Sequence, residues 1–533
     1  MITTPSLVED HYAKMLASHN WEVPEVYNMA VDVADRHPRH KRALILESTI
    51  EGRRDVNWGE IQDRSRQIAA TLQDAGIKKG DRVAVLLPQR ADTPAVYLGV
   101  LRTGAILVTM SLLWAPEPIR FRLGDSGATV IIAEEASKDL FAGYTGAFID
   151  VDSPAIAERP AVFQDVPTKA DDPALIFYTS GTTGRAKGIV HAHRTLLGHN
   201  EFDYCHALGD GDVFYGAGDW AWSLAKLMGP LRAGATHLVF RPAGGFDPAA
   251  LLDSLQRNKV TSALVNPTFL RKMREDVPDA GTRFPLSLRT VCSSNEPLTP
   301  DLIDWFRVQF GTTLLDYYGS TESYPLLGNF PDVPVKSGSM GRPLPGWEVR
   351  LLDEGENEVP VGATGEICLR ARSNPQYPLG YWNMPEASVA AFGGNWYHTK
   401  DQAYADDDGY FWFLGRIDDV IKTSGYRVGP YELEAVIREL DPVKDVSVTG
   451  VPDELRGQSI KAWVELMPGH SGDAQLNKSI VAHVKENFSR FAYPRYIEYV
   501  TALPKSATGK VQRAELRALP DPAPSDRNEG LAS

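Results

Sequence analysis

The chain has 533 residues, of which 43% are hydrophobic, and its 55 basic and 69 acidic residues give a net charge of -14. A chain of this length exceeds one ordinary domain and predicts a large core with at least one further module. The acidic balance argues against a general binder of nucleic acid or of anionic membranes.

Three cysteines, Cys205, Cys292 and Cys368, lie far apart and lack CxxC spacing. This spacing indicates neither a disulfide framework nor a zinc site, and it favours a reducing compartment. The N-terminal residues show no basic segment followed by an apolar one, and no uncharged apolar stretch approaches the ~20 residues that a bilayer requires. We therefore expect a cytoplasmic protein that does not insert into membranes. Its oligomeric state, a homo-oligomer included, stays open.

The first four hundred residues alternate helical and strand patterns. Asn57 and Glu60 have the spacing of a capping box, apolar residues follow at helical intervals, and Gly76 closes the predicted helix. Residues 81–88 then predict a buried strand. Further β-branched runs lie at residues 102–113, 128–135, 235–240 and 260–267. This alternation predicts an α/β protein with largely buried sheets.

The C-terminal part has a different pattern. Residues 430–440 begin with a proline and carry acidic residues in the first turn, which predicts an amphipathic helix with four apolar residues on one face: Leu433, Val436, Ile437 and Leu440. Residues 445–453 and 461–469 look like strands of a small α+β module. The polar tail after about residue 518 is expected to be disordered.

Residues 178–188 have the sequence YTSGTTGRAKG and end an apolar run. A strand that continues into glycines and hydroxyl residues exposes several N–H and O–H donors to an anion, and Lys187 adds positive charge. The stretch is not a P-loop, because Gly181 and Gly184 are separated by two residues rather than four, and Lys187 is followed by Gly188. We interpret it as a flexible clamp for ATP phosphates. The alternative is an ordinary connector.

Three further motifs follow in order: YYGSTES at residues 317–323, GRIDDVIKTSGYRVGPYELE at 415–434 and PKSATGK at 504–510. With the loop at 178–188, they resemble the adenylate-forming superfamily of acyl-CoA synthetases, luciferases and adenylation domains. The likeness is greatest to medium-chain or aromatic acyl-CoA synthetases and extends over most of the chain. It implies a large multi-subdomain N-terminal domain of packed sheets and helices that binds AMP and the acyl group, residues 1–416. A small mobile α+β C-terminal lid, residues 417–533, would follow.

The resemblance implies a reaction in two halves. A carboxylate attacks the α-phosphorus of ATP to give acyl-AMP and pyrophosphate, and the thiol of coenzyme A then attacks the acyl carbon. The β- and γ-phosphates would be held by hydroxyl, backbone and ammonium groups of one loop: Thr179, Ser180, Gly181, Thr182, Thr183, Gly184 and Lys187. Glu322 would coordinate Mg²⁺, Thr321 would contact the α-phosphate, and Tyr318 would stack on adenine.

The resemblance also assigns the ribose contacts. Asp401 would accept the ribose hydroxyls with the help of Arg416, although a solvated loop acid is the alternative for Asp401. The family has Thr-Gly-Asp where this chain has Thr399-Lys400-Asp401. We therefore expect the turn beside the ribose to differ from that of relatives.

Lys510 ends the last motif, at the position where the family has its catalytic lysine. It would bridge the carboxylate and the α-phosphate, and its charge would match the negative charge that builds on those oxygens in the transition state. The alternative is an ordinary exposed lysine, since Lys505 lies five residues away.

The resemblance further implies a hinge at Asp418, about which the lid rotates between the two half-reactions. The loop with Ser424 and Gly425 would then replace Lys510 at the active site. Gly425 would let the thiol arm of coenzyme A pass close to the backbone. Arg427 would contact the nucleotide phosphates.

The acyl pocket is predicted from three residues. Gly319 occupies the position where acetate-using relatives have a Trp, so the pocket is expected to be open. Trp220 and Trp222 lie in the segment 215–231, where the family builds the pocket wall. They line a cavity for a flat or medium-length acyl group or are core aromatics, and the sequence favours neither.

Two other features near the predicted site are ambiguous. Asn295 lies in the motif SSNEPL, where the family usually has a glycine or an alanine, so it would reshape the pocket or add a polar contact. His191 and His193 follow the phosphate loop. Their i, i+2 spacing does not place both on one helix face, and we assign no zinc site to them.

We therefore predict an ATP-dependent carboxylate–CoA ligase that acts on a small carboxylic acid, medium-chain or aromatic, with Mg²⁺ and coenzyme A and without nucleic acid. A stand-alone adenylation enzyme that loads a carrier protein would share the nucleotide motifs, but no carrier-like segment follows the lid. A luciferase-type oxygenase would need a specialised pocket. A non-enzymatic binding protein is disfavoured by Lys510, Glu322 and Asp401.

Overall fold

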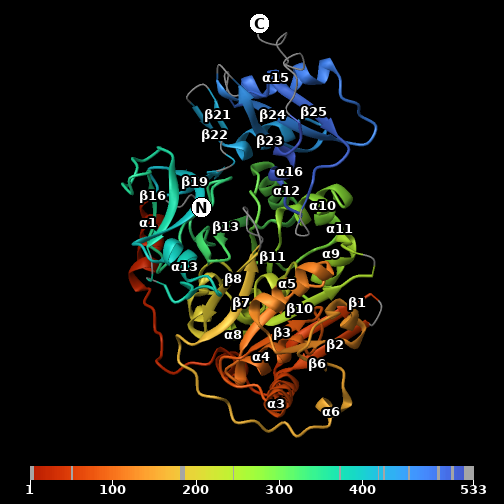
Figure 1. Cartoon of the computed structure of the whole chain (residues 1–533). Helices are drawn as coiled ribbons and strands as arrows, with labels where there is room; N and C mark the ends of the chain where they lie inside the picture. The colour runs from red at the N-terminus through yellow and green to blue at the C-terminus, as the bar shows by residue number, and fades with distance from the viewer. Residues whose placement is uncertain are drawn as a thin grey trace. The chain divides into compact units, whose positions relative to one another are not determined.

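The computed structural model describes residues 5–49, 52–179, 186–243, 245–370, 372, 374–417, 419, 421–423, 426–453, 456–488, 493–505 and 509–520. The chain forms two compact units (Figure 1). The larger unit comprises Met1–Val349 and Leu369–Tyr397, and the smaller unit comprises Arg350–Cys368 and His398–Ser533. The predicted domain boundary after Arg416 stays a prediction.

The larger unit contains a nine-stranded sheet whose central strands are parallel. In sheet order its strands are β15 (Arg342–Pro343), β14 (Ser323–Gly328), β13 (Leu314–Ser320), β12 (Thr290–Ser293), β11 (Ser262–Leu264), β9 (Val213–Gly216), β10 (Thr236–Arg241), β1 (Arg42–Ser48) and β2 (Gly52–Asn57).

A seven-stranded sheet is the second sheet of this unit. In sheet order its strands are β18 (Gly380–Tyr381), β8 (Lys187–Ala192), β7 (Pro173–Thr179), β4 (Ile106–Met110), β3 (Arg82–Leu86), β5 (Val130–Ala133) and β6 (Ala147–Asp150). The last five are mutually parallel, whereas β8 and β18 are antiparallel additions at one edge.

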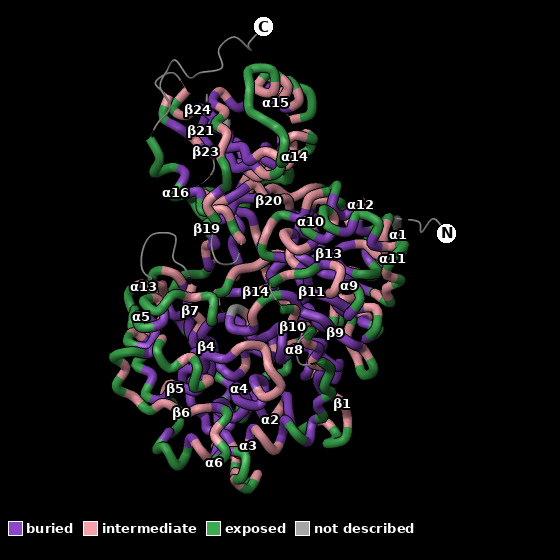
Figure 2. Tube along the Cα trace, turned by 90° about the vertical axis from the view of Figure 1, so that its right-hand side faces the viewer, coloured by how far each residue is buried: buried purple, intermediate pink, exposed green. Residues whose placement is uncertain are grey.

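Helices form three layers around these two sheets. A middle layer of α2 (Met29–Ala34), α3 (Trp58–Asp74), α4 (Thr93–Arg102) and α8 (Ala225–Ala233) shares one hydrophobic core with strands of both sheets. The outer face of the seven-stranded sheet is covered by α5 (Pro116–Ser126), and that of the nine-stranded sheet by α9 (Pro248–Arg257), α10 (Pro267–Asp276) and α12 (Pro300–Phe310). Figure 2 shows buried residues along strands such as β4 and along the middle helix α4.

The alternation within β3 explains this layering. Val83 and Val85 join the middle core, whereas Ala84 and Leu86 join the outer one. Successive side chains of a strand point to opposite faces, so a strand that is apolar at every position requires cover on both faces.

The remaining helical segments of the larger unit are short or peripheral. They are α1 (Pro5–Ser18), α6 (Pro154–Ala157), α7 (Glu201–Tyr204), α11 (Ala280–Arg283), α13 (Pro385–Phe392) and the 3₁₀ segments η1 (Glu135–Phe141), η2 (His193–Gly198) and η3 (Trp220–Trp222).

The smaller unit is built on two sheets. A four-stranded sheet has the order β16 (Val349–Leu352), β17 (Gly365–Arg370), β19 (Trp396–Ala405) and β20 (Phe411–Arg416). A five-stranded sheet joins β22 (Tyr426–Val428), β21 (Ile421–Thr423), β24 (Gly457–Leu466) and β23 (Val443–Asp453), with β25 (Tyr496–Val500) also paired to β24. Its helices are α14 (Pro430–Arg438), α15 (Ala474–Asn487) and α16 (Arg513–Arg517).

The expected α/β class and the expected elements are confirmed. Asn57 and Glu60 form the capping box of α3. Strands β3, β4, β5 and β11 lie within four of the five predicted runs, and β10 overlaps the fifth and ends one residue beyond it, at Arg241. Helix α14 begins at Pro430 and buries Leu433 and Ile437. No helix among the described residues is both long and apolar enough to cross a bilayer.

Candidate functional site

The predicted phosphate loop connects two antiparallel strands. Thr179 at the end of β7 pairs with Lys187 at the start of β8, so these two residues form the base of a hairpin. Five residues assigned to the loop, Ser180, Gly181, Thr182, Thr183 and Gly184, lie outside the described residues. The structure therefore fixes the two ends of the predicted clamp.

The motif YYGSTES forms a second hairpin. Ser320 of β13 pairs with Ser323 of β14, and Thr321 and Glu322 form the turn between them. Tyr318, predicted to stack on adenine, lies half-buried on β13. The predicted Mg²⁺ ligand and the predicted α-phosphate contact thus project together from one tight turn.

Tyr381 of β18 lies between the two hairpins. Its hydroxyl donates a hydrogen bond to Oε1 of Glu322 at 3.4 Å, and Nζ of Lys187 lies 5.1 Å from the centre of its ring. A cation over an aromatic face is attracted by the ring quadrupole. The ammonium group of the loop and the carboxylate of the turn therefore share one aromatic neighbour.

His191 of β8 makes a second link between the hairpins. Its Nε2 donates to the backbone oxygen of Thr321 at 3.1 Å. Burial lowers the pKa of His191 to about 4, so the ring is neutral at pH 7. His193 faces a different neighbour, because its Nδ1 accepts a hydrogen bond from the backbone N–H of Met29.

The carboxyl ends of the parallel strands bring further predicted segments to the turn. Residues that follow parallel strands meet at one edge of a sheet, which is where α/β proteins bind ligands. The hydroxyl of Tyr324, next to the turn, donates to Oγ of Ser294 at the end of β12. The hydroxyls of Ser293 and Ser320 are buried without a hydrogen-bond partner in the part of the chain that the structure describes. This edge therefore offers donors for a polar ligand.

Asn295 follows Ser294 and has a φ of +75°. Asn tolerates the left-handed region better than most residues with a side chain, which explains why it can replace a glycine here. Its Nδ2 donates to Oδ1 of Asn266, which follows β11. The substitution thus keeps a backbone conformation typical of glycine.

Gly319 lies at an irregularity in the pairing of β13 with β14. A Cβ at this position would lie 2.7 Å from the backbone oxygen of Ser323 and 2.8 Å from Cα of Tyr324. The close approach of the two strands therefore accounts for the glycine. Its role in opening an acyl pocket stays a prediction.

Trp220 is only 1% exposed and belongs to the middle core of the larger unit, where it packs edge-to-face on His237. This position supports the core alternative for Trp220. The side chain of Trp222 is not among those described. Beside them, Asp219 accepts a hydrogen bond from Ser111 at the carboxyl end of β4, so the predicted pocket segment contacts the second sheet.

The predicted ribose contacts are cross-strand neighbours in the smaller unit. Asp401 of β19 pairs with Arg416 of β20, and Oδ1 of Asp401 lies 3.6 Å from Nη1 of Arg416. Lys400 lies within β19 with a φ of +65°, a left-handed conformation that glycine adopts freely. The expected difference of this segment from that of relatives stays a prediction.

Lys510 lies at the base of a third hairpin. Lys505 and Val511 form an antiparallel bridge, and the N–H of Gln512 donates to the oxygen of Pro504. Lys505 also donates to Oδ2 of Asp445 at 2.7 Å, whereas Lys510 is exposed.

The carboxylate of Asp445 fixes this third hairpin by charge. Burial raises its pKa, but the charges of Arg438 and Lys505 outweigh burial and lower it to about 2. Lys505 therefore has a structural partner in Asp445.

Three residues with predicted roles on the lid lie outside the described residues: Asp418, Ser424 and Gly425. Arg427 belongs to β22, but its side chain is not described. The neighbours of the predicted hinge are anchored, since the N–H of Ile417 donates to the oxygen of Lys400 and Asp419 accepts a hydrogen bond from Arg517 of α16.

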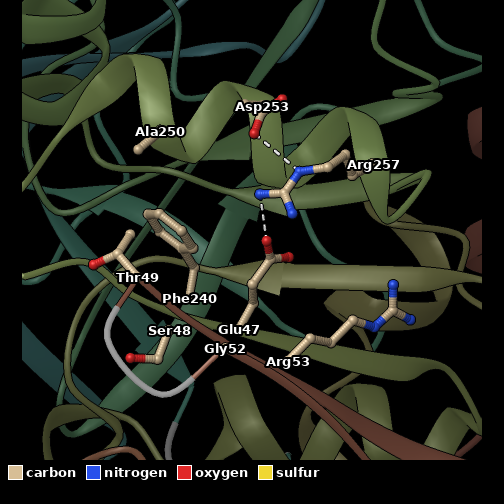
Figure 3. A pocket seen from close by; sticks show the side chains of 9 residues that line it. All are labelled: Glu47, Ser48, Thr49, Gly52, Arg53, Phe240, Ala250, Asp253 and Arg257. Atoms are coloured by element: carbon tan, nitrogen blue, oxygen red, sulfur yellow. Dashed lines mark hydrogen bonds and ion pairs between the residues drawn. The ribbon is translucent and has the colours of Figure 1, made fainter.

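A cavity of about 360 Å³ lies elsewhere in the larger unit, between β1, β2, β10 and α9 (Figure 3). Arg257 bridges Glu47 and Asp253 across it. None of the predicted site residues lines this cavity. We assign it no part in the reaction.

The sequence alone predicts no role for Tyr381 or for His191. Tyr381 lies about two hundred residues from the loop, and only the pairing of β18 with β8 brings it beside Lys187. Sequence spacing carries no signal of such pairing between distant strands.

Two family models match the chain. The AMP-binding enzyme model matches residues 31–382, and the model of the AMP-binding enzyme C-terminal domain matches residues 432–510. The acyl-coenzyme A synthetase ACSM3 of Mus musculus is 31% identical over 95% of this chain and 93% of its own. The benzoate–CoA ligase of Thauera aromatica is 32% identical over 93% and 97%.

Solved structures agree with these matches. The anthranilate CoA ligase AuaEII, solved in complex with anthranoyl-AMP, superposes with a TM-score of 0.84 at 28% identity, over 93% of this chain and 98% of its own. The chain belongs to the AMP-binding enzyme family, and within it to the AMP-forming acid–CoA ligases.

Proposed function

We propose that the protein is an ATP-dependent carboxylate–CoA ligase that forms acyl-CoA through an acyl-AMP intermediate with release of pyrophosphate. The observation that carries the proposal is the arrangement around Tyr381, which contacts both Lys187 at the base of the Gly-rich hairpin and Glu322 in the second turn. A cation and a carboxylate held this close suit a triphosphate with its bound metal ion.

The residues of the larger unit fit ATP and Mg²⁺. A hard cation such as Mg²⁺ takes carboxylate and phosphate oxygens, and Glu322 is a carboxylate on an open turn. When bound, Mg²⁺ neutralises phosphate charge. Lys187, Thr179 and the loop between them bind the β- and γ-phosphates, and Thr321 orients the α-phosphate. Tyr318 stacks on the adenine ring.

The smaller unit supplies the remaining groups in this proposal. Asp401 and Arg416 hold the ribose as neighbouring residues of a strand pair. Lys510 stabilises the charge that builds on the carboxylate and α-phosphate oxygens as acyl-AMP forms. The lid, residues 417–533, then turns at Asp418, and the loop with Ser424 and Gly425 admits coenzyme A, with Arg427 on the phosphates.

We propose an aromatic or medium-chain carboxylic acid as the substrate. Relatives named for benzoate and anthranilate cover nearly the whole chain, which supports an aromatic acid. Trp222, Gly319 and the segment after β9 remain the proposed pocket residues. Because Trp220 belongs to the core, we propose that it lies behind the pocket and does not contact the acid.

A pyrophosphate-release assay across short, medium-chain, branched and aromatic acids tests the proposal. Each acid is assayed with and without coenzyme A. We expect acid-dependent pyrophosphate release, with the highest kcat/KM for an aromatic or medium-chain acid, and multiple turnovers only with coenzyme A. Full turnover with a carrier-protein thiol but not with coenzyme A would contradict the proposed acceptor. Equal rates with and without acid would contradict the reaction itself.

A further inference from the structure

Cys368 has no other cysteine nearby in the chain. The fold gives it neighbours of another kind. Glu366 and Cys368 are two residues apart on β17, and His398 lies on the adjacent strand β19. Residues at i and i+2 of a strand share one face, so all three side chains meet on one side of this strand pair.

The ligand atoms of these three residues lie close together. Nδ1 of His398 is 3.3 Å from Sγ of Cys368 and 2.9 Å from Oε2 of Glu366. Among the residues that the structure describes, this is the group of three or more His, Cys, Asp or Glu side chains whose ligand atoms all lie within 4.8 Å of one another.

These distances suit a small transition-metal ion. Zinc binds thiolate sulfur at about 2.3 Å and imidazole nitrogen or carboxylate oxygen at about 2.0 Å, so tetrahedral ligands stand about 3.3 to 3.6 Å apart. The sulfur–nitrogen distance already lies in this range. The nitrogen–oxygen distance reaches it with a small rotation of the Glu366 carboxylate.

The residues around Glu366, Cys368 and His398 also suit a metal site. Nε2 of His398 lies 3.6 Å from Oε1 of Glu356, which gives the imidazole a carboxylate behind it. A carboxylate on the far nitrogen is the usual outer partner of a metal-bound histidine, because it fixes the tautomer. Cys368 is buried, whereas the side chain of His398 is 29% exposed and leaves a path for an ion.

We propose that Glu366, Cys368 and His398 form a binding site for a divalent transition metal of the zinc class. On binding, the thiol of Cys368 releases its proton to solvent, and the proton on His398 moves from Nδ1 to Nε2, where it stays and faces the carboxylate of Glu356. Thiolate and imidazole select such a metal over Mg²⁺, which prefers oxygen ligands. The proposed site is thus chemically distinct from the one for Mg²⁺·ATP and does not depend on the proposed ligase reaction.

A cobalt titration of the full chain in excess Mg²⁺ tests this site. Thiolate-bound Co²⁺ has a charge-transfer absorption in the near ultraviolet that Mg²⁺ sites cannot produce. We expect the wild-type protein to gain this band to saturation at one Co²⁺ per chain, and to lose it when Zn²⁺ is added.

Matched variants locate the ligands. Cys368→Ser should abolish the band and weaken Zn²⁺ binding by at least ~100-fold, and Glu356→Gln should weaken it by ~10-fold. Cys205→Ala is the control, since Cys205 is also a buried free cysteine, and it should leave both readouts unchanged. His398→Gln, at a partly exposed position, repeats the test if Cys368→Ser does not fold, as judged by circular dichroism. A wild-type protein without the band, or a band that survives in Cys368→Ser and His398→Gln, would overturn the proposal.

Discussion

The turn at Thr321 and Glu322 and the hairpin at residues 504–512 hold their functional residues differently. In the larger unit, the turn is held through its own backbone and side chains, since His191 contacts Thr321 and Tyr381 contacts Glu322. In the smaller unit, contacts fix the base of the hairpin through Lys505, while Lys510 itself is exposed.

The two kinds of support suit different steps of the proposed reaction. Groups that are fixed by neighbours suit the binding of the nucleotide. The nucleotide is present in both half-reactions, first as ATP and then as acyl-AMP. An exposed charged group on a hairpin that is anchored at Lys505 suits a residue that acts in one half-reaction. Substitutions in the turn should therefore affect both halves, whereas substitution of Lys510 should affect one.

The largest expected effect is that of Lys510→Ala. Formation of acyl-AMP should fall by at least ~100-fold, in line with the loss of one transition-state electrostatic partner, while supplied acyl-AMP is still converted to acyl-CoA. Each half-reaction is measured separately by quenched-flow sampling. Lys505→Ala is the matched control, and it should lower thermal stability while leaving the ratio of the two rates unchanged. If Lys510→Ala slowed both half-reactions equally, Lys510 would not act in acyl-AMP formation alone, and the proposed difference between the turn and the hairpin would be wrong.

Gly319→Ala should destabilise the larger unit. The new methyl group would meet the backbone of Ser323 and Tyr324 at under 3 Å, and such overpacking costs about 1–3 kcal/mol. Chemical denaturation measures this change. Gly124→Ala is the control, because a Cβ there meets nothing within 4 Å. If Gly319→Ala is as stable as the wild type, the strands leave room at residue 319, and an open acyl pocket there becomes the better explanation.

Tyr381→Phe should weaken the use of Mg²⁺·ATP by ~10-fold in kcat/KM, since it removes the hydroxyl that orients Glu322 and keeps the ring beside Lys187. The KM for ATP is measured at several Mg²⁺ concentrations. Tyr377→Phe is a close control: Tyr377 packs on Phe392 as Tyr381 does, but its hydroxyl has no hydrogen-bond partner among the described residues. Equal effects of the two substitutions would assign the loss to packing rather than to Glu322.

The smallest expected effect concerns Lys400, which precedes Asp401 on β19. Lys400→Gly should raise the free energy of unfolding by about 0.5–1 kcal/mol, because relief of the left-handed backbone exceeds the entropy that glycine adds to the unfolded chain. Lys400→Ala keeps the strain and serves as the control. If both variants gain the same stability, the charge of Lys400 rather than its φ is responsible.

Local patterns in the sequence predicted much of the fold. The capping box of α3, the apolar run of β3 and the face of α14 follow from residue periodicity, which depends only on near neighbours. The four ordered motifs predicted the family. Tyr381 and the pairing of Cys368 with His398 could not be predicted, because they depend on which distant strands become adjacent. The positive φ of Asn295 and of Lys400 was hidden for another reason, since neither residue type requires that conformation.

An isotope-transfer experiment tests the central claim most directly. The protein is incubated with ATP, coenzyme A and a carboxylic acid labelled with ¹⁸O in its carboxylate, and the products are analysed by mass spectrometry. If acyl-AMP forms by attack of the carboxylate on the α-phosphorus, one labelled oxygen must appear in AMP and none in pyrophosphate. Unlabelled AMP, or label in a phosphate product other than AMP, would contradict the proposed reaction.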